Sequence, residues 1–397
     1  MHRKPPYDCA QMSLPSTFDH AADFNPADDF DAFLRRIPAR WVVYLLADAQ
    51  DQPVQLLCVR NLRASLKRRL GSDQAVGPSR RINYRDLIRR IHWQRVDSAF
   101  EADWLYYEAA RRLFPQSYQG MIGFRSAWFL HVDPDAEFPR YIKTIDLSPR
   151  PGVFVGPLED KHAAARLIET IEDLFDLCRF YNILLQSPRG KACAYKEMGK
   201  CPAPCDGSIS LPQYRRLIQW SLDTLINPQP SFQEQQPRLQ DAAASMQFES
   251  AAKIKAYAAQ LEQLGKGALR HVRPLSDFRY VSLQRGPREQ SAKLLAITPG
   301  RIELLAGLIA GPDKSPELLD LIQRHNAAAS DVVDSVGAER IGIVSHHLFA
   351  PKQASGVFLC TQDLTASALA KAWKDLQKQK NQDDSDDEGL LKELQAM

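Results

Sequence analysis

The sequence predicts an α+β fold distributed over several small domains. Short apolar runs bounded by turn residues, such as Trp41–Leu46 and Val54–Val59, are typical of paired β-strands. Longer segments in which apolar residues recur at helical spacing, such as Phe100–Phe114 and Leu211–Ile226, are typical of amphipathic helices. The length of 397 residues suggests two or three domains, each large enough to bury its own core.

The composition is that of an ordinary globular protein, with 44% hydrophobic and 25% charged residues. No apolar run reaches the roughly 18 residues of a membrane span, so no membrane partner is expected. The segment Met1–Pro6 lacks the apolar stretch of a secretory signal. We therefore expect a cytoplasmic protein whose thiols stay reduced. The oligomeric state is not predicted.

The net charge of +3 hides an uneven distribution of charge along the chain. Between Arg60 and Arg95 there are eleven Lys or Arg residues and only two acids, whereas Asp19–Asp31 and Asp383–Glu388 are acidic. A local positive field attracts phosphate groups even when the whole chain is nearly neutral. The alternative for such a run is an ordinary solvated surface. The candidate nucleic-acid-binding residues are Arg60, Arg63, Lys67, Arg68, Arg81, Arg85, Arg89 and Arg90.

Four of the seven cysteines fall within 28 residues. They are Cys178, Cys193, Cys201 and Cys205. Glycine and proline residues near the last two break any helix there, so these thiols lie on a loop that can fold around an ion. Four thiolates satisfy one soft metal centre, and their spacing does not choose between iron–sulfur and zinc. The alternative is four unrelated free thiols.

The run Cys-x-Tyr-x-x-x-Gly-x-Cys-x-x-Pro-Cys-x-Gly, from Cys193 to Gly207, resembles the cysteine-rich segment of the UvrC/Cho family of excision-repair proteins. Gly156-Pro157 and the helical pattern Ala165–Phe175 precede it as in that family. The resemblance covers roughly Ile37 to Leu264. It implies a [4Fe–4S] cluster on the four cysteines, with zinc as the alternative.

The resemblance also implies a GIY-YIG-like nuclease domain, because two strands followed by a basic helix occupy its position. It further implies a Mg²⁺-dependent endonuclease that incises damaged DNA. By this likeness Tyr44 lies near the attacking water and Glu108 holds the metal. The catalytic arginine is Arg69 if the turn before its helix is longer than in the family. Hydrolysis of a phosphodiester needs such groups to activate water and stabilise developing charge.

Several positions depart from the family pattern. Gln55 replaces the second tyrosine, Cys58 the lysine and Gln119 the metal-site asparagine, and Ser65 aligns with the arginine. A lone carboxylate binds magnesium weakly, so Glu108 is alternatively a solvated helix carboxylate. The alternative function is a non-catalytic DNA-binding adaptor.

A second motif begins at Phe248. The string Phe-Glu-x-Ala-Ala-x-x-Lys resembles the UVR motif, an antiparallel helical hairpin of the same family. The resemblance implies docking of a UvrB-like protein, and the alternative is an Ala-rich surface helix. The expected partner-binding residues are Phe248, Glu249, Ala252 and Lys255.

These patterns predict seven segments, the last two without an assigned role. They are a disordered N-terminal segment (1–33), the GIY-YIG-like domain (34–150), a cysteine-rich domain (151–226), a linker (227–237), the UVR hairpin (238–266), a C-terminal α/β region (267–375) and a charged tail (376–397).

Overall fold

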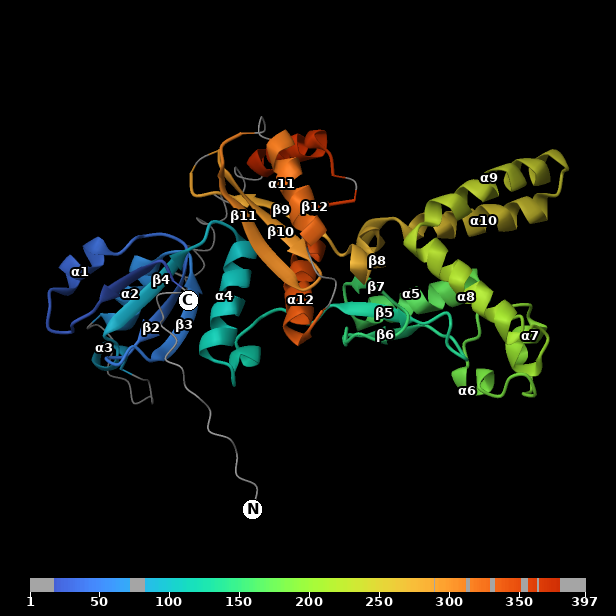
Figure 1. Cartoon of the computed structure of the whole chain (residues 1–397), viewed down its shortest axis with the longest axis horizontal. Coiled ribbons are helices and arrows are strands. Elements are labelled where there is room, and N and C mark those ends of the chain that lie inside the picture. Colours follow the sequence, from blue (N-terminus) through green and yellow to red (C-terminus); the bar gives the residue numbers. More distant parts are fainter. Residues whose placement is uncertain are drawn as a thin grey trace, which may run out of the picture. The chain divides into compact units, whose positions relative to one another are not determined.

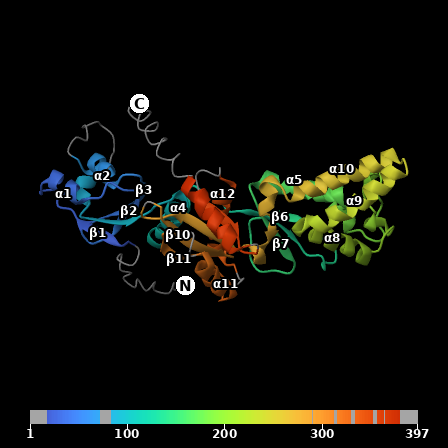
Figure 2. The same ribbon diagram turned by 90° about the horizontal axis from the view of Figure 1, so that it is seen from above.

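A computed structural model describes residues 18–71, 83–288, 290–311, 315–328, 333–350, 356–362 and 364–378. It contains helices and three four-stranded antiparallel sheets in the described residues, which confirms the predicted α+β class. The chain divides after Gly123 into two compact units (Figures 1 and 2). In the part of the chain that is described, no helix combines the length and apolar composition needed to cross a bilayer.

The first unit is built on one sheet with strand order β1-β4-β2-β3. Its elements are β1 (His20–Asp23), α1 (Phe30–Arg36), β2 (Val42–Ala47), β3 (Pro53–Val59), α2 (Leu62–Leu70), α3 (Tyr84–Leu87), β4 (Arg90–Arg95), α4 (Ala99–Leu113) and the 3-10 helix η2 (Tyr118–Gly120).

Alternation along β2 assigns helices to the two faces of this sheet, because successive strand side chains point to opposite sides. Tyr44 packs with Leu62 and Leu66 of α2. Val43 and Leu45 instead belong to the apolar cluster of α4. Helices α2 and α4 therefore cover opposite faces of the sheet.

The predicted disordered segment 1–33 is ordered from Phe18 onward. Strand β1 pairs with β4, and the ring of His20 stacks on Trp93 at 5.7 Å. Phe18 and Phe24 are buried. The local sequence is polar and does not predict this strand. Its pairing partner lies about 70 residues away, and a local pattern does not reveal such a partner.

The second unit begins with the sheet β6-β5-β7-β8, against which α5 packs. Its elements up to the hairpin are β5 (Trp128–Val132), β6 (Ile142–Thr144), β7 (Val153–Leu158), α5 (Lys161–Leu174), α6 (Tyr181–Leu184), α7 (Ala194–Glu197), the 3-10 helix η3 (Pro204–Asp206), α8 (Leu211–Ile226), α9 (Pro228–Ala244) and α10 (Phe248–Leu264). The segment 124–150, which the sequence assigned to the nuclease domain, thus supplies strands to the second unit instead.

The predicted linker 227–237 is the first part of helix α9, which forms a hairpin with α10 (Figure 1). Asn227 caps α9, and Pro228 stands at its first position, where a proline leaves no backbone donor unsatisfied. Ser231 Oγ lies 2.9 Å from Thr224 Oγ1 of α8. Tertiary packing therefore holds a Pro/Gln-rich stretch in helical form.

The remaining chain first adds strand β8 to the sheet of β5, β6 and β7 and then forms a sheet of its own. Its elements are η4 (Gly267–His271), β8 (Arg273–Pro274), η5 (Leu275–Asp277), β9 (Tyr280–Arg285), β10 (Ala292–Thr298), β11 (Arg301–Ile309), α11 (Ser315–Ala328), α12 (Ser335–Phe349), β12 (Val357–Cys360) and a helix over residues 366–378. Strand β8 pairs with β7, and the other strands form a sheet of order β11-β10-β9-β12. The first strand of the predicted C-terminal region, β8, thus belongs to the sheet of β5, β6 and β7.

Candidate functional sites

Tyr44 is fully buried, and its hydroxyl lies 2.9 Å from Ser65 Oγ. Arg69 comes within hydrogen-bonding reach of the same hydroxyl and also donates to Gln55 Oε1 at 3.1 Å. Burial raises the pKa of Tyr44, and the Ser65 hydrogen bond and the charges of Arg69 and Arg68 oppose that rise. The structure therefore brings Tyr44 and Arg69 together, inside a closed polar network.

Glu108 lies on α4, on the other face of the sheet from Tyr44 and Arg69. Its carboxylate accepts a hydrogen bond from Arg111 at 3.3 Å. Across the described residues, no group of three or more His, Cys, Asp or Glu side chains is arranged to hold a metal ion. The three residues expected to cut DNA do not form one site, and the donor set that magnesium requires does not surround Glu108.

The predicted basic residues divide into two sets. Arg85 donates to the carbonyls of Leu70 and Pro26, Arg89 to that of Ile88, and Arg90 pairs with Asp23. The side chains of these three cations are therefore already engaged within the first unit. Arg81 lies outside the described residues.

The second set follows α2. Lys67 and Arg68 are exposed and make no hydrogen bond or ion pair with any residue that the structure describes. Arg63 is exposed beside them and donates to Ile37 O at 2.9 Å. Arg60 lies over the Trp41 ring at 3.7 Å. Arg63 and Lys67 are four residues apart, so they lie on the same side of α2, and Arg60 precedes the helix; these cations form a basic stripe on α2 and its preceding turn.

The four cysteines lie on three neighbouring pieces of chain. Cys178 follows α5, and Cys193 is the N-cap residue of α7. Cys201 precedes η3, and Cys205 lies within it. Gly190 N donates to Cys205 O at 2.8 Å. The segment is thus a compact module, as its dense cysteine spacing predicts.

Burial and interactions between thiols shift the pKa values of these cysteines. The Cys178 thiol donates a hydrogen bond to Phe180 O at 3.6 Å. Interaction with the Cys178 side chain lowers the pKa of Cys201 to about 7. Interaction with Cys201 and burial raise the pKa of Cys178. Burial and the Asp206 carboxylate raise the pKa of Cys205, and Cys201 and Cys193 add to that rise.

A shared soft centre requires these thiol groups to turn toward one another, because no three of them are arranged around one point. The donor set nevertheless has the chemistry of such a centre, since sulfur is the ligand preferred by iron–sulfur clusters and structural zinc. The cysteines fit the implied group by type and neighbourhood, whereas the closed coordination geometry is absent from the described side chains.

Two consecutive residues of α7, Tyr195 and Lys196, connect this module, and of the two only Tyr195 belongs to the cysteine motif. Lys196 Nζ lies 2.5 Å from Asp206 Oδ2 and 2.6 Å from Ser208 Oγ. Tyr195 lies under the guanidinium of Arg179 at 4.3 Å. The pKa of Asp206 is held at about 2, first by Lys196 and then by Ser208. Lys196 is marked in the sequence only by its position between Cys193 and Cys201.

The tip of the helical hairpin is apolar and exposed. Met246 in the turn is 76% exposed and Phe248 is 73% exposed. Glu249, Ala252 and Lys255 are also exposed. The residues expected to bind a partner therefore share an accessible helix.

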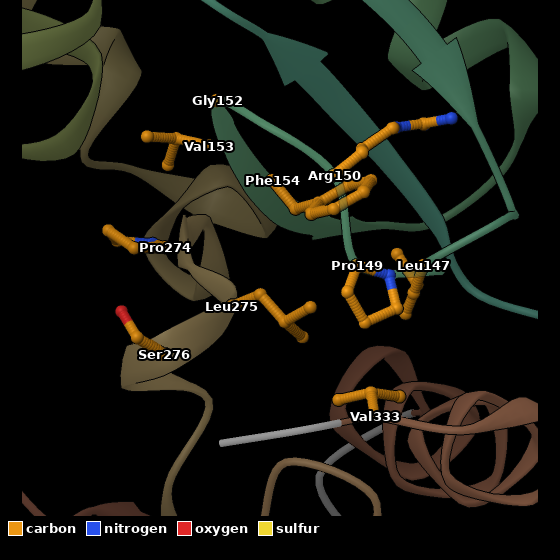
Figure 3. Close-up of a pocket in the computed structure, with 10 residues that line it drawn as sticks. All are labelled: Leu147, Pro149, Arg150, Gly152, Val153, Phe154, Pro274, Leu275, Ser276 and Val333. Carbon is orange, nitrogen blue, oxygen red and sulfur yellow. The ribbon is translucent and has the colours of Figure 1, made fainter.

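The second unit contains a groove and a smaller pocket. A groove of about 910 Å³ runs beside Cys201, Trp220 of α8 and Tyr257 of α10. A smaller pocket of about 360 Å³ lies between β7 and η5. In Figure 3 the Arg150 side chain lies along the ring of Phe154, and their separation is 4.9 Å. The smaller pocket contains none of the site residues predicted from the sequence.

Comparison with known proteins finds one matching family model. Residues 127–224 match the middle domain of the UvrC/Cho excinuclease, a range that includes all four clustered cysteines. No solved structure matches the chain.

Curated proteins named UvrABC system protein C are also similar. The one from Trichlorobacter lovleyi is 24% identical over 221 residues, covering 55% of this chain and 36% of that protein. The one from Syntrophotalea carbinolica is 27% identical over 233 residues, covering 57% and 37%. The one from Campylobacter jejuni strain RM1221 is 25% identical over 244 residues, covering 59% and 39%. The match thus spans less than two fifths of these relatives.

Proposed function

We propose that the chain, whose residues 127–224 match the UvrC/Cho middle domain, acts in nucleotide excision repair as a DNA-binding adaptor. In this proposal the first unit grips DNA without cutting it, and the hairpin α9–α10 docks a UvrB-like partner. The cysteine module holds an iron–sulfur cluster or zinc that keeps α7 and η3 in place.

The separation of Glu108 from Tyr44 supports the non-catalytic role most directly. A phosphodiester in contact with one of these side chains has the sheet between it and the other. Catalysis at one phosphate requires the water-activating group and the cation site to converge within a few ångströms. Tyr44 is also buried in an apolar cluster, and its hydroxyl is bound to Ser65.

The stripe on α2 supports DNA contact. Arg60, Arg63, Lys67 and Arg68 are exposed, and they lie on one helix and its preceding turn. Each Lys or Arg that neutralises a DNA phosphate makes the slope of log K against log salt concentration steeper by about 0.9. Lys67 and Arg68 have no competing ion pair within the described chain, so they are the residues to test.

The adaptor role is tested by binding and incision on the same damaged duplex. We expect the full chain to bind this duplex without cutting it when Mg²⁺ is added. The double variant Lys67→Ala/Arg68→Ala should lower the salt slope by about 2. Arg35→Ala/Arg36→Ala removes the same charge from α1 and is the matched control, with a smaller expected change.

Two results oppose the proposal. Mg²⁺-dependent incision by the wild-type chain that is lost in Glu108→Ala establishes an endonuclease instead. Equal slopes for the two double variants show that the stripe on α2 does not contact DNA.

A further inference from the structure

Cys193 lies on the least self-supporting element of the cysteine module. It caps α7, which has only four residues, Ala194–Glu197. A helix of one turn has little stability of its own because its nucleation cost is not repaid by further hydrogen bonds. The position of Cys193 therefore depends on side chains that tie α7 to its surroundings.

Two such ties run in different directions. Lys196 reaches Asp206 and Ser208, which directly follow Cys205. Tyr195 contacts Arg179 at 4.3 Å and the ring of Phe180 at 5.8 Å, and both directly follow Cys178. Helix α7 is thus held between the two segments that carry the other cysteines.

The Lys196 tie has more than an ordinary surface ion pair. Asp206 also accepts a hydrogen bond from Ser208 N at 2.9 Å, which fixes the carboxylate that Lys196 contacts. The Asp206 side chain is only 20% exposed. An isolated exposed ion pair contributes little to stability, but a partly shielded carboxylate with two hydrogen-bond donors holds a defined geometry.

We propose that Lys196 is a positioning residue for a centre of four thiolates, holding α7 against the Cys205 turn so that Cys193 can join the other three sulfurs. The inference rests on the metal centre proposed above. It adds that metal affinity depends on an ammonium group that is not itself a ligand. Loss of such supporting contacts typically lowers metal affinity about 10- to 100-fold.

The test uses the full chain, reduced and freed of metal, titrated with Co²⁺ and then with Zn²⁺ against a chromophoric chelator. Thiolate-bound Co²⁺ has charge-transfer and visible bands that report the number of sulfur ligands. For Lys196→Met we expect Zn²⁺ affinity to fall about 10- to 100-fold and the Co²⁺ bands to weaken. Lys196→Arg, which keeps the positive charge, should retain most of the affinity.

The matched control is Lys191→Met, an exposed lysine of the same module that has no hydrogen bond or ion pair within the described chain. It should bind both metals like the wild type. Asp206→Asn removes the other half of the pair and should reproduce Lys196→Met, which guards against a folding defect specific to one variant. Far-ultraviolet circular dichroism of each metal-free variant checks the fold.

Two outcomes overturn the inference and are distinguishable. Wild-type affinity in both Lys196→Met and Asp206→Asn shows that the thiolates assemble without this pair, and the proposed centre survives. If the wild-type chain shows no thiolate bands, takes up no Zn²⁺ and, when purified without oxygen, has no visible iron–sulfur absorbance, the centre itself is removed and the role of Lys196 falls with it.

Discussion

By the resemblance to UvrC/Cho proteins, Ser65 is expected to align with a catalytic arginine; in the structure its hydroxyl lies 2.9 Å from that of Tyr44. A hydroxyl pair buried in the apolar cluster of α2 and β2 cannot reach an incoming water. The same network places Arg69 against Gln55 rather than toward solvent.

The Tyr44–Ser65 pair predicts a non-additive double variant. Ser65→Ala or Tyr44→Phe alone leaves a buried hydroxyl with fewer partners, so each should lower the free energy of unfolding by about 1–3 kcal/mol. The double variant should cost little more than one single variant, because no hydroxyl is left behind. Urea unfolding of the four proteins measures the cycle. Strictly additive losses would show that the two hydroxyls are not coupled.

Glu172 predicts a dependence of stability on pH. Burial raises its pKa from 4.5 to about 7, and Arg179 opposes the rise. A carboxyl that holds its proton more tightly when folded stabilises the fold at low pH, and this contribution is lost as the pH rises from about 4.5 to about 7. Glu172→Gln should therefore gain stability over the wild type at pH 8, by about 1 kcal/mol after screening by solvent, and less at pH 5.

Thermal unfolding at the two pH values measures this difference. Glu169→Gln, an exposed carboxyl on the same helix, is the matched control and should show no comparable gain. A gain in Glu172→Gln that is equal at both pH values would contradict the assigned cause.

At the scale of elements, the hairpin α9–α10 separates a structural face from an accessible one. Leu261 and Ala258 of α10 are buried, whereas Phe248 is exposed at its first turn. A large exposed aromatic next to exposed Met246 is typical of a contact surface. The buried residues hold the hairpin, and the exposed pair is available to a partner.

Phe248→Ala should therefore weaken docking of a UvrB-like protein by at least about 2 kcal/mol while leaving the melting temperature unchanged. Leu261→Ala should instead lower the stability of the fold, by about 2–5 kcal/mol, because it leaves a cavity. Met198→Ala removes an exposed apolar side chain from the cysteine module and controls for non-specific hydrophobic binding. Calorimetric titration and thermal unfolding measure both effects. Unchanged affinity in Phe248→Ala would remove the hairpin tip from the interface.

At the scale of the whole molecule, the cysteine module belongs to the second unit only. The boundary after Gly123 leaves all four clustered cysteines on its C-terminal side. A ligand stabilises the folded state that binds it, by about 2.7 kcal/mol when present at 100 times its dissociation constant. The two units should therefore respond differently to metal.

Hydrogen exchange followed by peptide mass spectrometry tests this. Zn²⁺ added to the reduced, metal-free chain should increase protection in peptides from residues 124–288 and leave peptides from residues 18–71 and 83–123 unchanged. Equal protection of both sets would show that the units unfold as one.

Local pattern was sufficient for the elements with the clearest periodicity. Apolar runs predicted β2 and β3, and helical spacing predicted α4 and α8; each lies within a few residues of its expected bounds. The cysteine motif was likewise predictive, because the matched middle domain contains it. The residue roles at Tyr44, Arg69 and Glu108, the metal centre and the UVR docking residues remain predictions.

The sequence by itself determined the α+β class, the compact cysteine segment and the kinship, since all three are recorded in spacing and residue type along short stretches. Only the tertiary structure decided that β1 joins the first sheet, that the linker is helix α9, and that Glu108 and Tyr44 face opposite ways. The physical reason is that pairing partners and sheet faces are set by packing between distant segments, whose free energy outweighs local preference.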